Sequence, residues 1–156
     1  MKVKLNINSR EYQVEILPGE FLLETLRRLG LKGAKKGCDS GYCGACTVLL
    51  NGKPVNSCML FTAQAEGNDI QTIEGVGTQD SPHPLQKNFV ELGAVQCGYC
   101  TPGIILSAKA LLERNPSPTE DDVKEAIGGN LCRCTGYVKP IEAILKTADD
   151  LKEKGE

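Results

Sequence analysis

Eight cysteines are the residues of this sequence with the clearest capacity for chemistry. They fall into two sets of four with different spacing. The first set has the pattern C-x4-C-x2-C-x11-C and comprises Cys38, Cys43, Cys46 and Cys58. The second set has the pattern C-x2-C-x31-C-x1-C and comprises Cys97, Cys100, Cys132 and Cys134. Because thiolates bind zinc and iron–sulfur clusters, each set predicts a metal site.

The spacing of the first set is that of plant-type [2Fe–2S] ligands, in which three cysteines share one loop and a fourth follows at a distance. Glycines are interleaved with these cysteines at Gly37, Gly41 and Gly44, after Gly33. They allow the backbone to bend closely around a cluster. Amides of such a loop can then donate hydrogen bonds to the sulfurs.

The second set combines two separated pairs. Cys97 and Cys100 directly precede a predicted helix, whereas Cys132 and Cys134 follow Gly128-Gly129-Asn130. Convergence of the two pairs predicts a four-thiolate site, and the helix N-terminus favours the thiolate form of the first pair.

Three other roles compete for these cysteines. Structural zinc is an open alternative for the second set, although C-x1-C is an uncommon half-site, and it suits the first set poorly. Four disulfides would require export, for which there is no signal segment. A thioredoxin-like Cys97-x-x-Cys100 would need a preceding strand, and the preceding residues have helical character.

The elements that must position the first set predict a small α+β domain. Alternation of apolar and polar residues predicts a β-hairpin over 1–17, turning at Asn8-Ser9-Arg10, and leucines at i, i+4 and i+7 predict a helix over 20–29 closed by Gly30. A strand over 47–50, a turn at Asn51-Gly52, a return strand from Val55 and a strand over 70–73 complete the domain.

The second half predicts a helix bundle after a polar connector over 78–84. Pro84 suits the first turn of a helix, Thr101 suits the N-cap of a helix over 103–114, and Thr119 with Asp122 suits a capping box. The final helix has an apolar face that comprises Ile141, Ile144, Leu145, Ala148 and Leu151. We therefore expect two domains, at 1–77 and 78–156.

Composition excludes several classes of function. The 156 residues carry a net charge of −2, which gives no basic field for nucleic acid, and no apolar run approaches the roughly 18 residues of a membrane span. Because the amino terminus lacks a signal-peptide pattern, we expect a cytoplasmic protein. His83 is the single histidine, so Rieske-type ligation is excluded and no catalytic residue is predicted.

Three long motifs resemble one family. They are GCDSGYCGACTVL at 37–49, QCGYCTPG at 96–103 and GNLCRCTGY at 129–137. Together they resemble the iron–sulfur subunit of molybdenum hydroxylases, the family of xanthine dehydrogenase, aldehyde oxidoreductase and aerobic carbon monoxide dehydrogenase. The resemblance covers nearly the whole chain, and every cysteine position matches.

The resemblance implies a plant-ferredoxin-like β-grasp domain followed by an all-α four-helix-bundle domain, each with one [2Fe–2S] cluster. It implies an electron-transfer subunit of an oxidoreductase that relays electrons between a molybdopterin-type molybdenum cofactor and FAD. It also implies that Gln96 hydrogen-bonds the pterin and that Cys134 approaches it. Substrate chemistry would then occur in a partner subunit.

The partners implied by the resemblance are a large molybdopterin-binding subunit and a medium FAD-binding subunit, commonly in two copies each. The chain ends soon after the predicted bundle, as expected for a separate small subunit. A free ferredoxin-type carrier is the alternative, although such a carrier needs only the first domain. The sequence does not indicate the substrate, the electron acceptor or the direction of electron flow.

Overall fold

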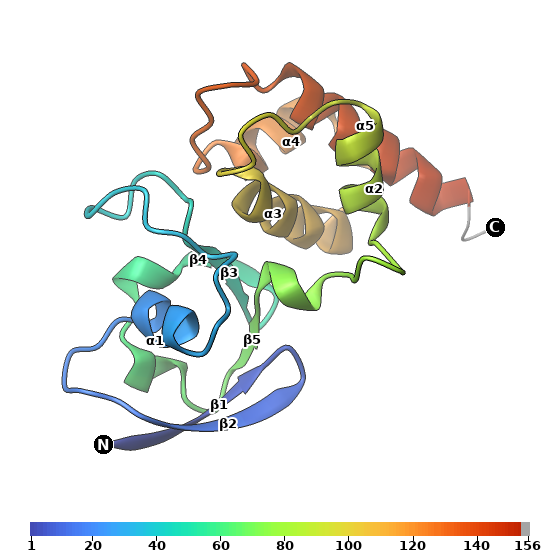
Figure 1. Ribbon diagram of the computed structural model, residues 1–156. Coiled ribbons are helices and arrows are strands. Elements are labelled where there is room, and N and C mark those ends of the chain that lie inside the picture. The colour runs from blue at the N-terminus through green and yellow to red at the C-terminus, as the bar shows by residue number, and fades with distance from the viewer. Residues whose placement is uncertain (154–156) are drawn as a thin grey trace.

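The computed structural model describes residues 1–153, which form a sheet-containing half followed by a helical half (Figure 1). The first half contains β1 (Lys2–Ile7), β2 (Arg10–Glu15), α1 (Leu22–Arg28), β3 (Thr47–Leu50), β4 (Lys53–Asn56) and β5 (Asp69–Gln71). The second half contains α2 (Pro84–Glu91), α3 (Thr101–Arg114), α4 (Glu120–Ile127) and α5 (Val138–Glu153). The predicted α+β class, a ferredoxin-like domain followed by a helical domain, is confirmed.

The five strands form one mixed sheet in the order β2-β1-β5-β3-β4. β1 and β2 pair antiparallel, as the alternation over 1–17 predicts, and β5 pairs parallel with β1. The turn of the first hairpin contains only Asn8 and Ser9, both with positive φ, because Arg10 already pairs with Ile7. Central β5 therefore joins the two hairpins into one sheet.

The second hairpin, β3 with β4, turns at Asn51-Gly52, where both residues have positive φ as this turn requires. The return strand begins at Lys53, two residues before the predicted Val55, because Lys53 pairs directly with Leu50. β5 is likewise shifted to Asp69–Gln71 from the predicted 70–73. The hairpin brings Asn56 opposite Thr47, at the end of β3 that adjoins Cys46.

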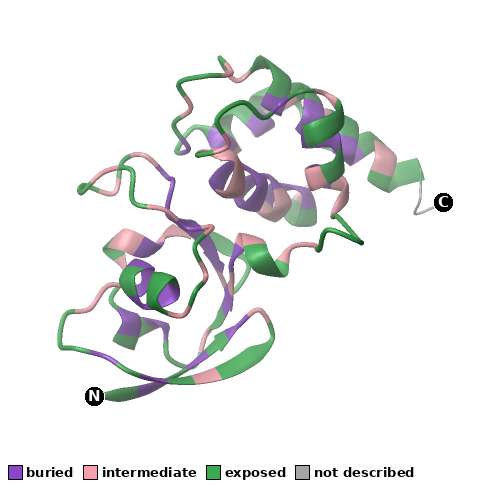
Figure 2. Ribbon diagram, in the orientation of Figure 1, coloured by how far each residue is buried: buried purple, intermediate pink, exposed green. Residues whose placement is uncertain are grey.

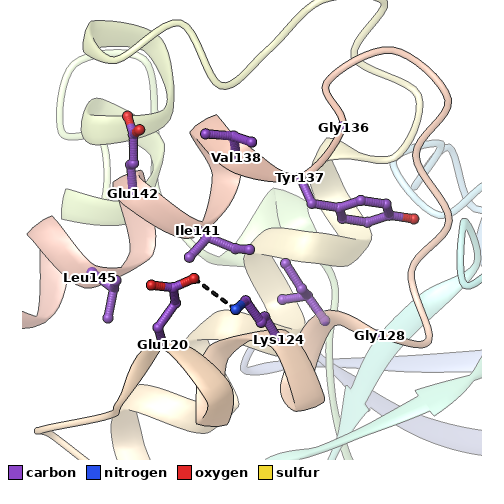
Figure 3. A pocket seen from close by; sticks show the side chains of 10 residues that line it. Glu120, Lys124, Gly128, Gly136, Tyr137, Val138, Ile141, Glu142 and Leu145 are labelled. Atoms are coloured by element: carbon purple, nitrogen blue, oxygen red, sulfur yellow. Dashed lines mark ion pairs between the residues drawn. The ribbon is translucent and has the colours of Figure 1, made fainter.

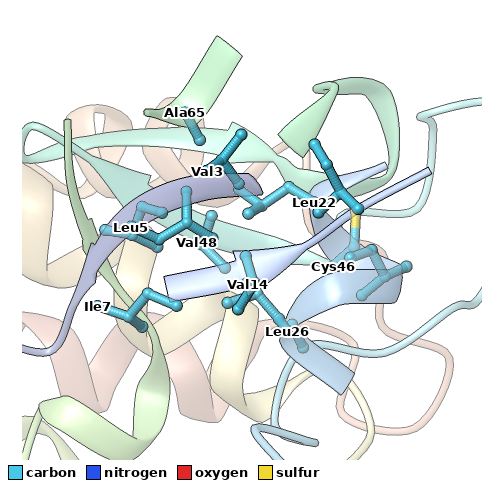
Figure 4. Packing of buried hydrophobic residues seen from close by; sticks show 13 residues of the cluster. Val3, Leu5, Ile7, Val14, Leu22, Leu26, Cys46, Val48 and Ala65 are labelled. Atoms are coloured by element: carbon cyan, nitrogen blue, oxygen red, sulfur yellow. The ribbon is translucent and has the colours of Figure 1, made fainter. Parts of the chain in front are cut away.

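α1 covers one face of the sheet, and its buried leucines meet side chains from the strands (Figure 4). Leu22 and Leu26 are fully buried against Val3, Val48 and other strand residues. The helix is shorter than the predicted 20–29, but Gly30 closes it as predicted, with φ of 87°. The Gly30 amide donates to the Arg27 carbonyl and the Leu31 amide donates to the Leu26 carbonyl, which is a Schellman motif.

The caps of the helical half differ from prediction at one place. Thr119 and Asp122 form the predicted capping box of α4, and Pro84 occupies the first turn of α2. Thr101, however, is the first residue of α3 rather than its N-cap, and Cys100 occupies the cap position. The helix can begin earlier because Pro102 lies in the first turn, where no amide donor is needed.

The buried face of α5 is also rotated from prediction. Ala143, Ile144 and Ala148 are buried, whereas Ile141 and Leu145 are half-buried and Leu151 is exposed. Thr147, a polar residue that the apolar pattern omits, takes a buried position because its hydroxyl contacts Asn88 of α2. Hydrogen bonding thus sets which face of the helix is inside.

The two halves meet where α3 packs against β3 and β4. Figure 2 shows buried residues along α3 and along the strands that lie nearest to it. Each half also has its own apolar core, the first around Leu5, Leu22 and Val48 and the second around Phe89, Ile104 and Ile144. α3 is therefore both the centre of the helical half and its contact with the sheet.

Glu20 anchors the start of α1 and predicts a pH dependence of stability. Its carboxylate accepts hydrogen bonds from the Leu17 amide at 3.0 Å, the Thr25 hydroxyl at 2.6 Å and Arg28 at 2.6 Å. Desolvation acts to raise the pKa of Glu20, but these hydrogen bonds outweigh it and lower the pKa from 4.5 to about 2. The resulting stabilisation is present above about pH 4.5 and is lost as pH falls toward 2.

We expect Glu20→Gln to lower the unfolding free energy at neutral pH and to flatten its dependence on pH between 4.5 and 2. Denaturant unfolding across this range measures both effects. Glu11→Gln is the control, because the Glu11 carboxylate is exposed and its ion pair with Lys4 is long, at 4.0 Å. A slope equal to wild type in Glu20→Gln would contradict the assignment.

Candidate metal centres

Three cysteines of the first set, Cys38, Cys43 and Cys46, lie on the loop between α1 and β3 (Figure 1, cyan), whereas Cys58 follows β4. Gly41 and Gly44 both adopt a φ of 69°, which lets this loop turn around its own sulfur atoms. Cys46 is buried at the end of the loop, and Cys58 reaches it from a short 3₁₀ helix over Ser57–Met59. The structure therefore brings all four residues of the predicted first set to one place.

The four sulfurs of the first set group in two pairs. The Sγ atoms of Cys46 and Cys58 are 3.3 Å apart, and the thiols of Cys38 and Cys43 hydrogen-bond to each other. Backbone amides point at one pair: those of Tyr42 and Cys43 donate to Cys38 Sγ at 3.3 and 3.4 Å. The amide of Ala45 donates to Cys43 Sγ at 3.5 Å. The predicted loop amides thus reach the sulfurs.

These contacts shift the thiol pKa values in opposite directions. Backbone amides lower the pKa of Cys38 to about 6. Burial, followed by the hydrogen bond to Cys46, raises the pKa of Cys58 to about 12, and burial likewise raises that of Cys43. A metal must displace the protons of the raised thiols when it binds, so metal binding at this site releases protons.

The second set lies where α3 begins. Cys97 and Cys100 stand before the helix, and Cys132 and Cys134 stand on the loop between α4 and α5. The thiols again pair, Cys100 with Cys132 and Cys97 with Cys134. Cys97 and Cys134 are exposed, whereas the Cys100–Cys132 pair is half-buried. The predicted convergence of the two distant segments is observed.

In each pair of the second set, one thiol has a lowered pKa and its partner a raised one. The Tyr99 amide lowers the pKa of Cys97, and the hydrogen bond to Cys97 raises that of Cys134. Burial raises the pKa of Cys100 to about 12. Burial opposes the shift at Cys132, but hydrogen bonds from Thr135 outweigh it and lower the pKa of Cys132.

The donor sets fit a dinuclear cluster better than zinc. A tetrahedral zinc ion needs four ligands around one point. A [2Fe–2S] cluster has four cysteine ligands, two on each iron, and two pairs of thiols match that arrangement.

Sequence reasoning missed a tyrosine that holds the second loop. The Tyr137 hydroxyl accepts a hydrogen bond from the Cys132 amide at 2.8 Å and donates to the Asn130 carbonyl at 3.2 Å. Tyr137 adopts a φ of 68°, and its amide donates to the Thr135 hydroxyl. Its place two residues after Thr135 in the GNLCRCTGY motif carries no ligand chemistry, so only the folded loop reveals its role.

Gln96 lies beside the second set, as its position before Cys97 requires. Its Nε2 donates to the carbonyl of Cys134 at 3.1 Å, and both residues are exposed. The two residues that the resemblance links to the pterin are therefore adjacent on the surface. His83, in contrast, is the N-cap of α2, where its Nδ1 accepts a hydrogen bond from the Leu85 amide. It therefore caps a helix and takes no part in either sulfur set.

The two sets are joined by direct contacts between their loops. The Leu131 amide, next to Cys132, donates to the Cys43 carbonyl at 2.9 Å. The Tyr99 hydroxyl donates to the Lys36 carbonyl at 2.7 Å, and Lys35 Nζ lies 5.4 Å from the centre of the Tyr99 ring. Residues that flank the ligands of one set thus touch residues that flank the ligands of the other.

A groove between α4 and α5 adjoins the loop of the second sulfur set, because Gly136 and Tyr137 line it (Figure 3). It has a volume of about 660 Å³, an apolar floor that includes Ile127, Ile141 and Leu145, and an ion pair between Glu120 and Lys124 at its rim. Its lining contains no cysteine or histidine.

Over residues 1–153, none of the helices is long and apolar enough to cross a membrane.

The contacts of Tyr137 predict a selective effect on the second site. Tyr137→Phe removes the acceptor of the Cys132 amide, and leaving such a donor unpaired costs about 1–3 kcal/mol. We expect the second site to lose bound iron faster than the first when a chelator is added, measured by iron release. Tyr12→Phe is the control, since Tyr12 packs against the core of the first half. Equal loss from both sites would contradict the role of Tyr137.

Two family models together match nearly the whole chain. Residues 5–72 match a "2Fe-2S iron-sulfur cluster binding domain" and residues 72–145 match a "[2Fe-2S] binding domain". Each matched segment contains one of the two cysteine sets. The chain therefore contains two [2Fe–2S]-binding domains.

Known proteins resemble the chain in both sequence and fold. The nicotinate dehydrogenase small FeS subunit of Eubacterium barkeri is 51% identical over 143 residues, which cover 91% of each chain. The xanthine dehydrogenase iron-sulfur-binding subunit of Escherichia coli O157:H7 is 41% identical over 92% of this chain and 91% of its own.

A solved structure extends the match to three dimensions. A chain of quinoline 2-oxidoreductase from Pseudomonas putida 86 superimposes with a TM-score of 0.93 at 40% identity, covering 100% of this chain and 98% of that one. Family models, relatives and fold agree, and they confirm the resemblance found in the three cysteine motifs. The chain belongs to the family of small [2Fe–2S] electron-transfer subunits of the molybdenum hydroxylases.

Proposed function

We propose that each cysteine set holds one [2Fe–2S] cluster, with one pair of thiolates on each iron. In the first site the pairs are Cys38 with Cys43 and Cys46 with Cys58. In the second site the pairs are Cys97 with Cys134 and Cys100 with Cys132. The observed thiol contacts support this assignment, because they join the same residues two by two.

The proposed function of the chain is to relay electrons between a molybdenum cofactor and FAD in partner subunits. Each bound cluster accepts and gives up one electron at a time. The protein's part is to hold the clusters close together and to limit the access of water. The hydrogen bond from the Leu131 amide to the Cys43 carbonyl carries this proposal. It links Cys43 of the first site to the residue directly before Cys132 of the second site, so few covalent bonds separate it from either set of sulfurs.

The second site is proposed to face the molybdenum cofactor. Cys97, Cys134 and Gln96 are exposed on one side of the helical half, where a partner can reach them. Gln96 would hydrogen-bond the pterin, and Cys134 would lie close to it. Since the Gln96 amide donates to the Cys134 carbonyl, the two residues would meet the pterin together.

The first site is proposed to face the FAD-binding subunit. Tyr42, Met59 and Phe61 are exposed apolar side chains next to the first cysteine set, with exposures of 77%, 57% and 44%. Exposed apolar residues that gather at one site are typical of a surface that a partner covers. A complex with a large molybdopterin-binding subunit, a medium FAD-binding subunit and two copies of each would cover both ends.

We further propose domain limits of 1–77 and 78–156 and a cytoplasmic location. Ile73 and Val76 already pack against the helical core, so the end of the first domain is anchored to the second. A reducing compartment keeps cysteines as thiols that can bind clusters, which supports the location. Substrate chemistry is assigned to a partner, since both cysteine sets are engaged in cluster binding.

A free ferredoxin-type carrier is the second candidate. Its strength is the first domain, which alone would suffice for a carrier. The exposed Gln96 beside Cys134 favours a fixed partner instead, because a carrier has no use for a pterin-binding amide. Co-purification of the chain with molybdenum- and flavin-containing subunits separates the two candidates, and isolation as a fully active free carrier would support the second.

Single ligand changes should affect the clusters one at a time. We expect Cys43→Ser to abolish the signal of the first cluster and Cys100→Ser that of the second, because each removes one thiolate from one iron. Electron paramagnetic resonance of the reduced, iron-loaded chain measures both signals. If either change removed both signals while circular dichroism showed a folded chain, the assignment of the sites would be wrong.

A further inference from the structure

Asn130 is a buried amide at the contact between the two halves. Its side chain donates through Nδ2 to the Gly44 carbonyl at 3.1 Å and to the Thr47 hydroxyl at 3.0 Å. Its Oδ1 accepts from the Ser107 hydroxyl at 2.8 Å, and the residue is only 3% exposed. One side chain thus joins the first cysteine loop, the start of β3 and α3.

The position of Asn130 in the chain links these contacts to both sulfur sets. Gly44 lies next to Cys43 in the first set, and Cys132 of the second set follows two residues after Asn130. Between them, the Leu131 amide donates to the Cys43 carbonyl. The Asn130 side chain therefore holds together two backbone segments, one at Gly44 and one at Asn130 itself. The hydrogen bond between Leu131 and Cys43 joins the same two segments one residue further along.

The glycines around Asn130 show how closely the two halves approach. A Cβ atom at Gly44 would lie 2.2 Å from the Gly129 carbonyl oxygen and 2.7 Å from Asn130 Nδ2. A Cβ atom at Gly103 would lie 2.6 Å from the Gly44 carbonyl oxygen and 2.8 Å from Asn130 Nδ2. Because neither site has room for a side chain, the amide fills the remaining space between three backbone segments.

The hydrogen bonds of Asn130 are matched to this place. An unpaired amide buried to this extent would cost stability, and its three hydrogen bonds use both its N–H donors and its oxygen acceptor. The partners come from both halves of the chain. A buried amide that only stabilises one half would need partners from that half alone. Asn88 is an example, because its amide donates to Thr147 and Asp150, which both lie in the helical half.

We propose that Asn130 is a positioning residue for electron transfer between the two clusters. It keeps the Cys43 carbonyl and the Leu131 amide in contact, and so sets the distance and the bonded connection between the sites. This inference rests on the proposed function, in which both cysteine sets hold clusters. Asn130 touches neither cluster in this role and acts through the backbone that carries Cys43 and Cys132.

The test uses the full chain loaded with iron and sulfide. Asn130→Ala removes the three hydrogen bonds, and Ser107→Ala removes only one of them. Asn88→Ala is the matched control, because Asn88 is an equally buried asparagine, 2% exposed, that bridges α2 and α5 away from the cysteines. Electron paramagnetic resonance measures both cluster signals and the magnetic interaction between the reduced clusters, and hydrogen exchange measures protection of the Leu131 amide.

In Asn130→Ala we expect both cluster signals to remain, the interaction between them to weaken, and the Leu131 amide to exchange about tenfold faster. Ser107→Ala should change the magnetic interaction and the Leu131 exchange rate in the same direction by a smaller factor. If Asn130→Ala does not fold, Ser107→Ala tests the inference in its place, and wild-type values in that variant would then contradict it. Asn88→Ala should lower the free energy of unfolding and leave the magnetic interaction unchanged. Exchange of the Leu131 amide should become faster only as far as global unfolding does.

Wild-type interaction and Leu131 protection in a folded Asn130→Ala chain would overturn the inference. Equal changes in Asn88→Ala would also overturn it, since the effect would then be general destabilisation. Failure of the proposed function is distinct: a fully loaded wild-type chain would itself lack two cluster signals. The two failures are therefore separated by the wild-type spectrum alone.

Discussion

The structure depends on a backbone contact between the first cysteine loop and the start of α3. Gly44 and Gly103 allow the loop carbonyl to approach the helix so closely that no Cβ atom would fit at either position. This contact fixes α3 against β3 and β4, and α3 is the central helix of the second half. The positions of both sulfur sets relative to each other therefore follow from two residues that have no side chain.

Hydrogen bonding and burial give the thiols of each site unequal acidity. Amide donors stabilise the thiolates of Cys38 and Cys97, whereas burial stabilises the protonated forms of Cys58 and Cys100. The thiols of each site therefore differ in how readily they lose a proton. Metal binding must remove the remaining protons, so the free energy of binding depends on pH and contributes to the folding of both halves.

Local patterns predicted most of the fold and the identity of the cysteine sets. Alternation in 1–17, the Asn51-Gly52 turn and the Thr119–Asp122 capping box are all short-range features, and each was confirmed. The pairing of thiols, the displaced cap at Cys100 and the buried face of α5 were not predictable in the same way. They depend on contacts between distant segments, such as Thr147 with Asn88, and no local spacing encodes them.

Asn130 illustrates the same limit at the candidate site. Its motif was visible, but a lone asparagine between two glycines and a leucine indicates a turn rather than a bridge. Its function follows only when Gly44 and Ser107 are brought to it, 86 and 23 residues away in the chain. Spacing can reveal ligands, whereas it cannot reveal the residues that hold the ligands in place.

The groups that hold the two sulfur sets together are almost entirely uncharged. The hydrogen bonds of Asn130, Leu131 and Tyr99 involve amides, hydroxyls and carbonyls, and the ion pairs among residues 1–153 each join two residues within the same half. Dissolved salt screens charged pairs on the surface but leaves buried neutral hydrogen bonds largely unaffected. Changes in ionic strength therefore act on the outer surface of the chain, while the spacing between its two sulfur sets stays the same.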